Sequence, residues 1–359
     1  MKHLHICTGA NYVTVNGYIK LINSSFNNED HLFIIRDNVT NPLQQVSGYE
    51  NVRFMPRAEN EDFKELLSMM KEAGHIWFHS MGWNWHTQLK LLMHPAIMKK
   101  SSWVEWGADL YDWKRTEGRK LNVWLTNTVM KRWRQKVSSV VAIFPADEKV
   151  IHREFGDKVK VIHAIYSIYY HESLDENKPG SLKMNDSYNI LVGHSAVRNC
   201  HHFECFDALS KFKNENIMLH IPLTYGDMDY AKEVQEYARK IFPEEKLHFI
   251  MENIPLDDYV KFLWQIDASV FKCYRQIALG NICKLLYMCK KVWLPKGSLM
   301  HDCFTEKETE IYDFDDIPSL TFEEFSKPAT STEPSAYMQG RMIKENVVKQ
   351  WDDAFEGRW

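Results

Sequence analysis

The feature that most constrains the fold is a regular alternation of short apolar strands with amphipathic helices. In the first half, strands are predicted at 4–7, 32–35, 52–55, 76–79 and 139–144, with helices at 15–26 and 62–73 among them. Such alternation is typical of a parallel sheet covered by helices on both faces. The loop after the first strand lacks the G-x-G-x-x-G spacing, so a dinucleotide fingerprint is not predicted.

The alternation breaks once and then restarts, which indicates two domains. Residues 172–186 mix charge with Pro179 and Gly180, and a new strand follows at 188–192. A chain of 359 residues, 45% of them hydrophobic, can bury two cores of common size. We therefore expect an α/β protein with a first domain at 1–170, a linker at 171–187, a second domain at 188–330 and a C-terminal helix within 331–359.

Composition excludes several classes of protein. The net charge of -4 argues against a general nucleic-acid binder. The seven cysteines form no C-x-x-C pair, which argues against a disulfide frame or a zinc ribbon and favours a reducing compartment. The N-terminal stretch has too short an apolar run for a signal peptide, and no stretch approaches the ~20 apolar residues of a spanning helix. A cytoplasmic protein, soluble or on a membrane surface, is expected.

The stretch 271–294 carries the strongest sign of a ligand. It is predicted as strand, turn, helix and strand, and its helix buries a stripe that begins at Ile282. Gly280 and Asn281 lie where backbone N–H groups lack an intrahelical acceptor, so an anion fits there. Arg275 and Gln276 approach the same place and could meet a phosphate. An ordinary strand-to-helix loop with a capping Asn is the alternative.

Two further strand ends of the second half are rich in donors. Gly193, Ser195 and Arg198 follow one strand, and Thr224 and Tyr225 follow the next. Together with the loop at 275–281 they suit a nucleotide diphosphate, with Tyr225 near the base or sugar. A metal site is the weaker interpretation, because the nearby histidines and cysteines fit no standard zinc spacing, namely His194, Cys200, His201, His202 and Cys205.

The first half offers three candidates for acid–base chemistry. His79 ends a predicted strand, where ligands of parallel sheets collect, although a histidine satisfied by backbone groups is equally typical there. Asp109 follows an apolar strand among aromatic rings and could act as a general base, with Glu105 a weaker rival. The alternative for Asp109 is a helix N-cap.

A basic stretch in the first half points to a membrane surface. Between Trp113 and Lys136 there are eight basic residues and one acid, Glu117, interleaved with Trp124 and Trp133. Cations mixed with tryptophan suit an anionic membrane. A solvated helix face with buried indoles is the alternative.

Four motifs in order resemble one glycosyltransferase family. They are WGADLY at 106–111, ILVGHSAVRN at 190–199, PLTYGDMDYAKEV at 222–234 and the loop from Arg275 to Gly280. They look like the bacterial TDP-N-acetylfucosamine:lipid II N-acetylfucosaminyltransferases (4-alpha-L-fucosyltransferases, glycosyltransferase family 56), which have the two-domain GT-B fold. The resemblance covers most of the chain. His194 and Thr224 depart from the family pattern, which affects the identity of the donor.

The resemblance implies transfer of a 6-deoxy amino sugar such as N-acetylfucosamine from a nucleotide diphosphate, TDP above all, to a lipid-linked saccharide at the cytoplasmic face of the membrane. It implies no cofactor and no metal, and the absence of a D-x-D motif agrees. By position, Ser195 and Arg198 would contact phosphate, Tyr225 and Glu252 the nucleoside or sugar, and Asp109 the acceptor. The loop residues Arg275, Gln276, Gly280 and Asn281 would hold the diphosphate. A sugar-nucleotide epimerase and a non-catalytic scaffold of the same fold are the alternatives.

Overall fold

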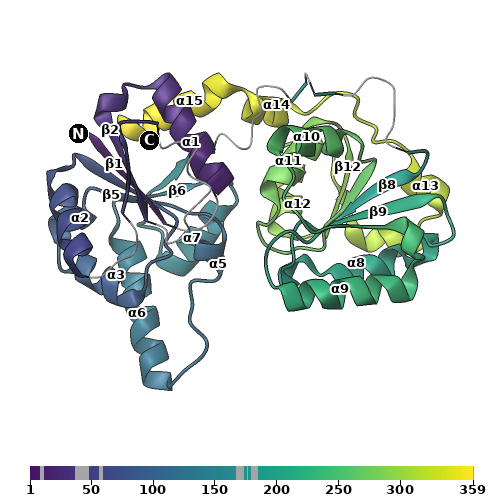
Figure 1. Ribbon diagram of the computed structural model, residues 1–359, viewed down its shortest axis with the longest axis horizontal. Coiled ribbons are helices and arrows are strands. Elements are labelled where there is room, and N and C mark those ends of the chain that lie inside the picture. The colour runs from purple at the N-terminus through teal and green to yellow at the C-terminus, as the bar shows by residue number, and fades with distance from the viewer. Residues whose placement is uncertain are drawn as a thin grey trace. The chain divides into compact units, whose positions relative to one another are not determined.

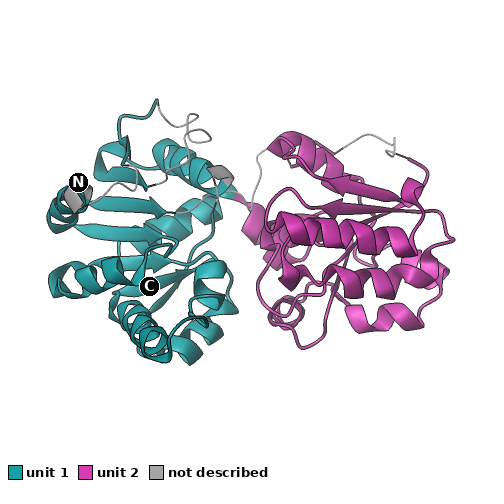
Figure 2. Ribbon diagram, turned by 60° about the horizontal axis from the view of Figure 1, so that its bottom comes forward, with its two compact units in different colours: residues 1–168, 344–359 teal, residues 169–343 magenta. Residues whose placement is uncertain are grey.

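The protein is described by a computed structural model, which covers residues 1–8, 12–36, 48–55, 60–166, 174–175, 177–178 and 185–358. Two compact units divide the chain: unit 1 comprises 1–168 and 344–359, and unit 2 comprises 169–343 (Figure 2). The predicted linker falls largely outside the described residues. The second domain was predicted to end at 330, whereas unit 2 continues to Ile343.

Unit 1 is built on a seven-stranded sheet in the order β3-β2-β1-β4-β5-β6-β7, and every strand pair in it is parallel (Figure 1). This confirms the predicted alternation. The strands are β1 His3–Thr8, β2 His31–Arg36, β3 Val52–Phe54, β4 His75–His79, β5 Ser101–Val104, β6 Ser139–Ala142 and β7 Val161–His163. The helices are α1 Tyr12–Ser25, α2 Asn60–Glu72, α3 Trp85–Leu92, α4 Pro95–Met98, α5 Ala108–Tyr111, α6 Lys120–Lys136, α7 Asp147–Phe155 and α15 Lys344–Phe355.

Unit 2 repeats the plan with a six-stranded parallel sheet in the order β10-β9-β8-β11-β12-β13. The strands are β8 Tyr188–Val192, β9 Ile217–Pro222, β10 Leu247–Ile250, β11 Ala268–Val270, β12 Lys291–Leu294 and β13 Tyr312–Asp313. The helices are α8 His202–Leu209, α9 Met228–Ile241, α10 Leu256–Trp264, α11 Leu279–Tyr287, α12 Leu299–Glu306, α13 Phe322–Ser326 and α14 Ala336–Met342.

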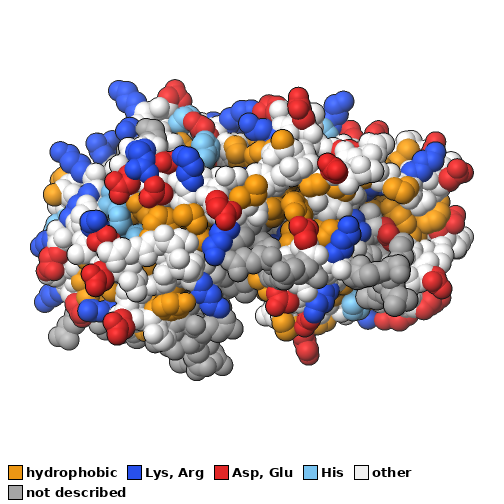
Figure 3. All heavy atoms as spheres, turned by 90° about the horizontal axis from the view of Figure 1, so that it is seen from above, with side chains coloured by type: hydrophobic (Ala, Val, Ile, Leu, Met, Phe, Trp, Pro, Cys, Tyr) orange, Lys and Arg blue, Asp and Glu red, His pale blue; other side chains and the backbone are white. Residues whose placement is uncertain are grey.

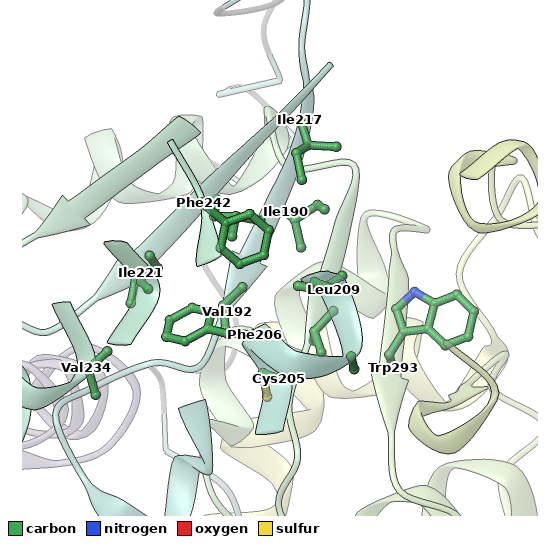
Figure 4. Close-up of a cluster of buried hydrophobic side chains, with 14 of the residues drawn as sticks. Ile190, Val192, Cys205, Phe206, Leu209, Ile217, Ile221, Val234, Phe242 and Trp293 are labelled. Atoms are coloured by element: carbon green, nitrogen blue, oxygen red, sulfur yellow. The ribbon is translucent and has the colours of Figure 1, made fainter. Parts of the chain in front are cut away.

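The core of unit 2 explains why its sequence reads as near-continuous apolar runs. Buried side chains of β8 and β9 meet Phe206 of α8 and Phe242 at the end of α9, and the whole cluster is shielded from water (Figure 4). Central parallel strands are covered on both faces, so they carry few polar residues. Burial of each large side chain contributes roughly 1.5–3 kcal/mol to stability.

The C-terminal segment differs from the prediction of one helix. The chain forms α14 and then α15, with exposed Ile343 between them. α14 buries Met338 within unit 2, whereas α15 buries Trp351 within unit 1, where its indole N–H donates to the carbonyl of Ile165. The helix is interrupted at Ile343, whose backbone is extended with a φ of -89° and a ψ of 121°. The predicted return of the chain to the first domain is confirmed for α15.

Candidate active site

Three neighbouring strands of unit 2 bring its predicted ligand residues to one edge of the sheet. β9, β8 and β11 are adjacent, and the loops after them carry Thr224 and Tyr225, Gly193 to Arg198, and Arg275 to Asn281. Parallel strands end at the same edge, so these loops meet there. The strand order reverses between β8 and β11, which is the point where α/β sheets bind ligands.

Ring contacts join the three loops. The ring of His194, after β8, lies 6.0 Å edge-on from that of Tyr225, after β9. The ring of His201 lies 6.1 Å from that of Tyr274, after β11. Tyr225 and Tyr274 are each 56% exposed, so both offer a free aromatic surface at this edge. Tyr274 was missed because the sequence placed it inside a strand, whereas β11 ends at Val270.

The loop after β8 requires glycine. Gly193 has a φ of 66°, and a Cβ on it would lie 2.4 Å from Nε2 of His202. The imidazole of His202 is buried under this loop, and its Nδ1 lies 3.3 Å from the Tyr230 hydroxyl. A side chain at position 193 would therefore meet both backbone strain and a steric clash.

Ser195 and Arg198 lie in the same loop but differ in exposure: Ser195 is buried and Arg198 is exposed. The Ser195 side chain is fully buried and its hydroxyl lies 3.0 Å from Nε2 of His194. Arg198 forms a bidentate ion pair with Glu233 at 3.0 Å and lies over the Tyr230 ring. Burial lowers the pKa of His194 to about 4, so this imidazole is neutral.

The helix α11 begins as the phosphate hypothesis requires. It starts at Leu279, after Ala278 in a left-handed conformation, so Gly280 and Asn281 lie in its first turn. The first amides of a helix have no intrahelical acceptor and favour an anion. The side-chain amide of Asn281 donates to the hydroxyl of Tyr259 at 2.9 Å. Gln276, in the loop before the helix, is buried. Glu252 is exposed after β10, the strand next to β9.

Lys284 is a buried cation of α11 that sequence reasoning did not single out. Its ammonium lies 3.5 Å from the carbonyl of Gly280, one turn nearer the start of the helix. Burial lowers the pKa of Lys284 to about 8. The sequence signal for Lys284 was its i, i+4 spacing from Gly280, which places the two residues on the same face of the helix.

In unit 1, Asp109 is held by three donors. Its carboxylate accepts from the backbone N–H of Met81, from the indole of Trp103 and from the backbone N–H of Trp106, each at 2.7 Å. The N-cap alternative is wrong, because Gly107 occupies the cap position of α5. Burial raises the pKa of Asp109, while these bonds and the nearby Arg134 hold it down. A raised pKa suits a general base.

Glu105 and His79 do not reach solvent. Both side chains are fully buried, so neither can touch an acceptor in this structure. Glu105 instead accepts from the backbone N–H of Gly107 and of Ile143, which ties the strand ends of β5 and β6 together. Burial, with Asp147 and Asp109 nearby, raises the pKa of Glu105 well above its usual range. Contrary to the prediction that they are catalytic, His79 and Glu105 do not lie where a substrate could reach them.

His79 belongs to a buried chain of imidazoles. Its Nε2 lies 3.0 Å from His5, and the other nitrogen of His5 lies 3.0 Å from His31. The Nδ1 of His79 meets the hydroxyl of Tyr166, to which the indole of Trp106 donates. Indole nitrogen can only donate, so the Tyr166 hydroxyl is free to donate to His79. The chain runs from β2 through β1 and β4 to the loop that holds Asp109.

The basic stretch of unit 1 divides into a buried and an exposed part. Trp113, Trp133 and Arg134 are buried, and the guanidinium of Arg134 lies 4.9 Å from the ring of Trp103. These residues are part of the core, contrary to the prediction that they contact a membrane. Trp124, in contrast, is 64% exposed. The tryptophans differ in exposure because α6 is long and only its second half packs against the rest of unit 1.

Comparison with known proteins settles the family. The family described as "4-alpha-L-fucosyltransferase glycosyl transferase group 56" matches residues 23–333, most of the chain. The chain belongs to this family. It is therefore a glycosyltransferase that uses a nucleotide sugar, which confirms the predicted enzyme class.

Solved structures agree on the fold. HepE of Anabaena, in complex with UDP and glucose, has a TM-score of 0.70 at 11% identity, covering 99% of this chain and 100% of its own. Sucrose-phosphate synthase of Thermosynechococcus elongatus has a TM-score of 0.65 at 11% identity, with 99% of both chains covered. A glycosyltransferase of Rickettsia africae has a TM-score of 0.60 at 13% identity, covering 99% of this chain and 98% of its own. The predicted GT-B fold is confirmed.

Two negative findings concern the described residues alone. None of their helices is both long and apolar enough to cross a membrane. No group of three His, Cys, Asp or Glu side chains among them could hold a metal ion. Acidic and basic side chains are interspersed over the face in Figure 3, as the small net charge leads one to expect.

Proposed function

We propose that the enzyme transfers a 6-deoxy amino hexose such as N-acetylfucosamine from TDP to a lipid-linked saccharide during synthesis of a bacterial surface polysaccharide. The description of the family as a 4-alpha-L-fucosyltransferase supports a 6-deoxy hexose as the transferred sugar. The single observation that carries the donor site is the convergence of three loops at the carboxyl ends of β9, β8 and β11. The enzyme works in the cytoplasm on the inner face of the cell membrane.

The diphosphate binds at the start of α11. Backbone amides at the start of α11, that of Gly280 among them, bear partial positive charge, while the N–H of Asn281 already donates to the carbonyl of Ala278 at 2.9 Å. Arg275 adds a guanidinium from the preceding loop. Gly193 lets the loop after β8 pack directly on buried His202, where a Cβ would lie 2.4 Å from Nε2, and this packing fixes the backbone of the loop at the same edge. These groups neutralise the leaving diphosphate, so the proposed mechanism uses no metal and no other cofactor.

The nucleoside and sugar lie against exposed rings. Tyr225 and Tyr274 follow β9 and β11, on either side of the loop after β8, and both are largely exposed. A base or a deoxy sugar can stack on such rings, which gain about 0.5–1.5 kcal/mol beyond their buried area. Glu252 is exposed after β10 and accepts a sugar hydroxyl. Arg198 closes the phosphate side of the loop when its partner Glu233 releases it.

Asp109 is the proposed base. It takes the proton of the acceptor hydroxyl as that oxygen bonds to the anomeric carbon, and the bond from this carbon to the diphosphate oxygen breaks. Burial raises the pKa of Asp109 toward the range where a carboxylate accepts a proton effectively. The chain of imidazoles reaches the loop around Asp109 through Tyr166 and Trp106.

A screen of nucleotides by thermal shift tests the donor half. A ligand at ~100 times its dissociation constant should stabilise the fold by about 2.7 kcal/mol. We expect TDP to give a larger shift than UDP or GDP. A preference for UDP would overturn the TDP assignment, and no shift with any of the three would overturn the donor site. Transfer of radiolabelled sugar to a lipid-linked saccharide then tests the acceptor.

A further inference from the structure

The strongest feature outside the sugar site is the free end of α6. In Figure 1 this helix and the loop before it project from the body of unit 1. We call residues 115–125 the α6 tip. Three large apolar side chains are exposed there: Leu121 at 72%, Trp124 at 64% and Leu125 at 40%.

The tip is a built hairpin and not a loose loop. The side chain of Asn127 accepts from the backbone N–H of Arg115 at 2.8 Å and donates to its carbonyl at 3.0 Å. Gly118, with a φ of 118°, turns the chain, and Arg119 precedes the helix. Buried Trp113 fixes the base of the hairpin against Phe155. The apolar residues are therefore held out into solvent by ordered backbone.

The exposed side chains share one face of the helix. Leu121, Trp124 and Leu125 have i, i+3 and i+4 spacing, and Lys131 and Arg132 continue the same stripe two turns later. A rise of 1.5 Å per residue puts these two cations about 11 Å from Trp124 along the axis. Amphipathic elements bury their apolar side chains roughly 5–10 Å into a bilayer interface.

The charge of the hairpin decides between occupants. Between 114 and 136 Glu117 is the only acid, and Arg119, Lys120, Lys131 and Arg132 are exposed. No carboxylate among the described residues pairs with any of these four. Two such tips would repel one another, so a second copy of this chain is disfavoured. A partner with an apolar interior and an anionic surface fits both the exposed apolar side chains and the exposed cations.

We propose that the α6 tip inserts Leu121, Trp124 and Leu125 into the interface of an anionic bilayer, with Lys131 and Arg132 at the level of the lipid phosphates. The geometry of the hairpin carries this inference, which rests on the proposed function only for its purpose, namely to hold unit 1 where a lipid-linked saccharide can reach it. Lys120 keeps its ammonium in water by extending along the helix.

Vesicle sedimentation with the full chain tests the tip. We expect the wild type to pellet with vesicles of phosphatidylcholine and phosphatidylglycerol, and less with phosphatidylcholine alone. Leu121→Ser with Trp124→Ser should lower the partition about tenfold or more, because two large apolar side chains no longer enter the interface. Lys131→Glu with Arg132→Glu should lower it as well, and added salt should weaken wild-type binding.

Phe54→Ser is the matched control. Phe54 is 49% exposed on β3, so the variant removes an exposed apolar side chain from unit 1 outside the tip and should bind vesicles as the wild type does. Equal binding by the tip variant and the wild type would overturn the proposal. So would a tip variant that changes only the oligomeric state in gel filtration, since the tip would then bind a second copy.

A transfer assay separates this proposal from the proposed function. The tip variant should lose activity on a lipid-linked saccharide in vesicles but keep it on a short, water-soluble acceptor, and it should still be stabilised by TDP. If the tip binds vesicles but no sugar is transferred to either acceptor, the proposed function fails and the tip stands. If sugar is transferred to the vesicle acceptor equally by wild type and tip variant, the tip proposal fails alone.

Discussion

The carboxyl edges of the two sheets are built from the same topology and differ in what they expose. In unit 1 the candidate side chains His79 and Glu105 are fully buried, and Asp109 is held by three hydrogen bonds. In unit 2 the corresponding edge exposes Tyr225 and Tyr274 and has a loop at Gly193 that leaves no room for a side chain.

This difference separates two tasks. An edge with exposed rings, a glycine loop and a helix start can take up a ligand without first breaking internal bonds. An edge whose polar groups are already satisfied can hold one carboxylate in a fixed position and a fixed environment. Preorganisation of this kind lowers the cost of aligning a base with its substrate.

The largest effect is expected at Asp109. Asp109→Asn cannot accept a proton, so turnover should fall by roughly 10²–10⁴ while nucleotide affinity is unchanged. The amide also offers one oxygen where the carboxylate offers two, so one of its three donors loses a partner and unfolding should cost about 1–3 kcal/mol less. Steady-state kinetics, calorimetric titration with TDP and thermal unfolding measure the three quantities.

Glu105→Gln is the matched control for this variant. Glu105 also accepts two backbone N–H groups through its two oxygens, but it is shut off from substrate. The variant should lose stability to a similar extent and retain turnover at temperatures where it is folded. Near-normal turnover of Asp109→Asn would assign Asp109 to structure alone.

The histidine chain predicts that unit 1 is sensitive to acid. Burial lowers the pKa of His31 and His79 to about 3 and that of His5 well below its usual range. The unfolded chain binds protons below pH 6.5 while these folded imidazoles stay neutral, so stability is complete above pH 6.5 and falls as the pH drops toward 3. Between pH 7 and pH 5, protonation of the unfolded chain at each of these histidines should lower the free energy of unfolding by about 2 kcal/mol.

Amide hydrogen exchange measured at pH 7 and at pH 5 compares the loss of stability in the two units. Among the described residues, unit 1 contains two further histidines whose pKa is lowered by burial, His3 and His75, which makes five. Unit 2 contains four histidines with a lowered pKa, His194, His202, His220 and His248, of which His248 is exposed. Amides of unit 1 should therefore lose more protection than those of unit 2. A greater loss in unit 2 would contradict this part of the comparison.

In unit 2 the diphosphate contact should be sensitive to Arg275. Removal of a charge-assisted hydrogen bond in Arg275→Ala should weaken TDP binding by about 1.5–3 kcal/mol, with the fold retained. Arg198→Ala is the comparison, because Arg198 is exposed and already paired with Glu233 and should contribute less. Unchanged affinity in a calorimetric titration of Arg275→Ala would remove Arg275 from the site.

The smallest effect concerns a difference between two glycines of unit 2. Gly193 and Gly297 both have positive φ, 66° and 77°, but only Gly193 lies against another residue, His202. Alanine at either position costs about 1 kcal/mol or more of backbone strain. Gly193→Ala should cost a further 1–3 kcal/mol for the clash and should weaken TDP binding. Equal stability of the two variants would show that the loop yields to a side chain.

Local pattern predicted the strands and the strand ends, because the period of apolar residues reports which side chains are buried. The two parallel sheets and the helix start near Gly280 followed from it, whereas the GT-B fold was implied by the resemblance of four motifs to a glycosyltransferase family. The burial of His79 and Glu105 could not be predicted from this pattern, because it depends on His5, Tyr166 and Ile143, which lie far away in sequence.

Two other outcomes needed the three-dimensional structure for the same reason. The tryptophans at 113, 124 and 133 look alike in sequence, and only the extent of packing along α6 separates buried from exposed ones. Tyr274 looked like a strand residue because the apolar run passes the end of β11 at Val270 by several positions. The chain leaves the sheet before the apolar run stops.

Amide hydrogen exchange with and without TDP locates the donor on one of the two sheet edges. If unit 2 takes up the donor at its carboxyl edge, TDP should protect amides at 193–200, 223–228 and 274–283 and leave 80–83 and 105–109 unchanged. Protection at 105–109 without protection at 274–283 would contradict the account, since the nucleotide would then bind at the edge that is assigned here to the base.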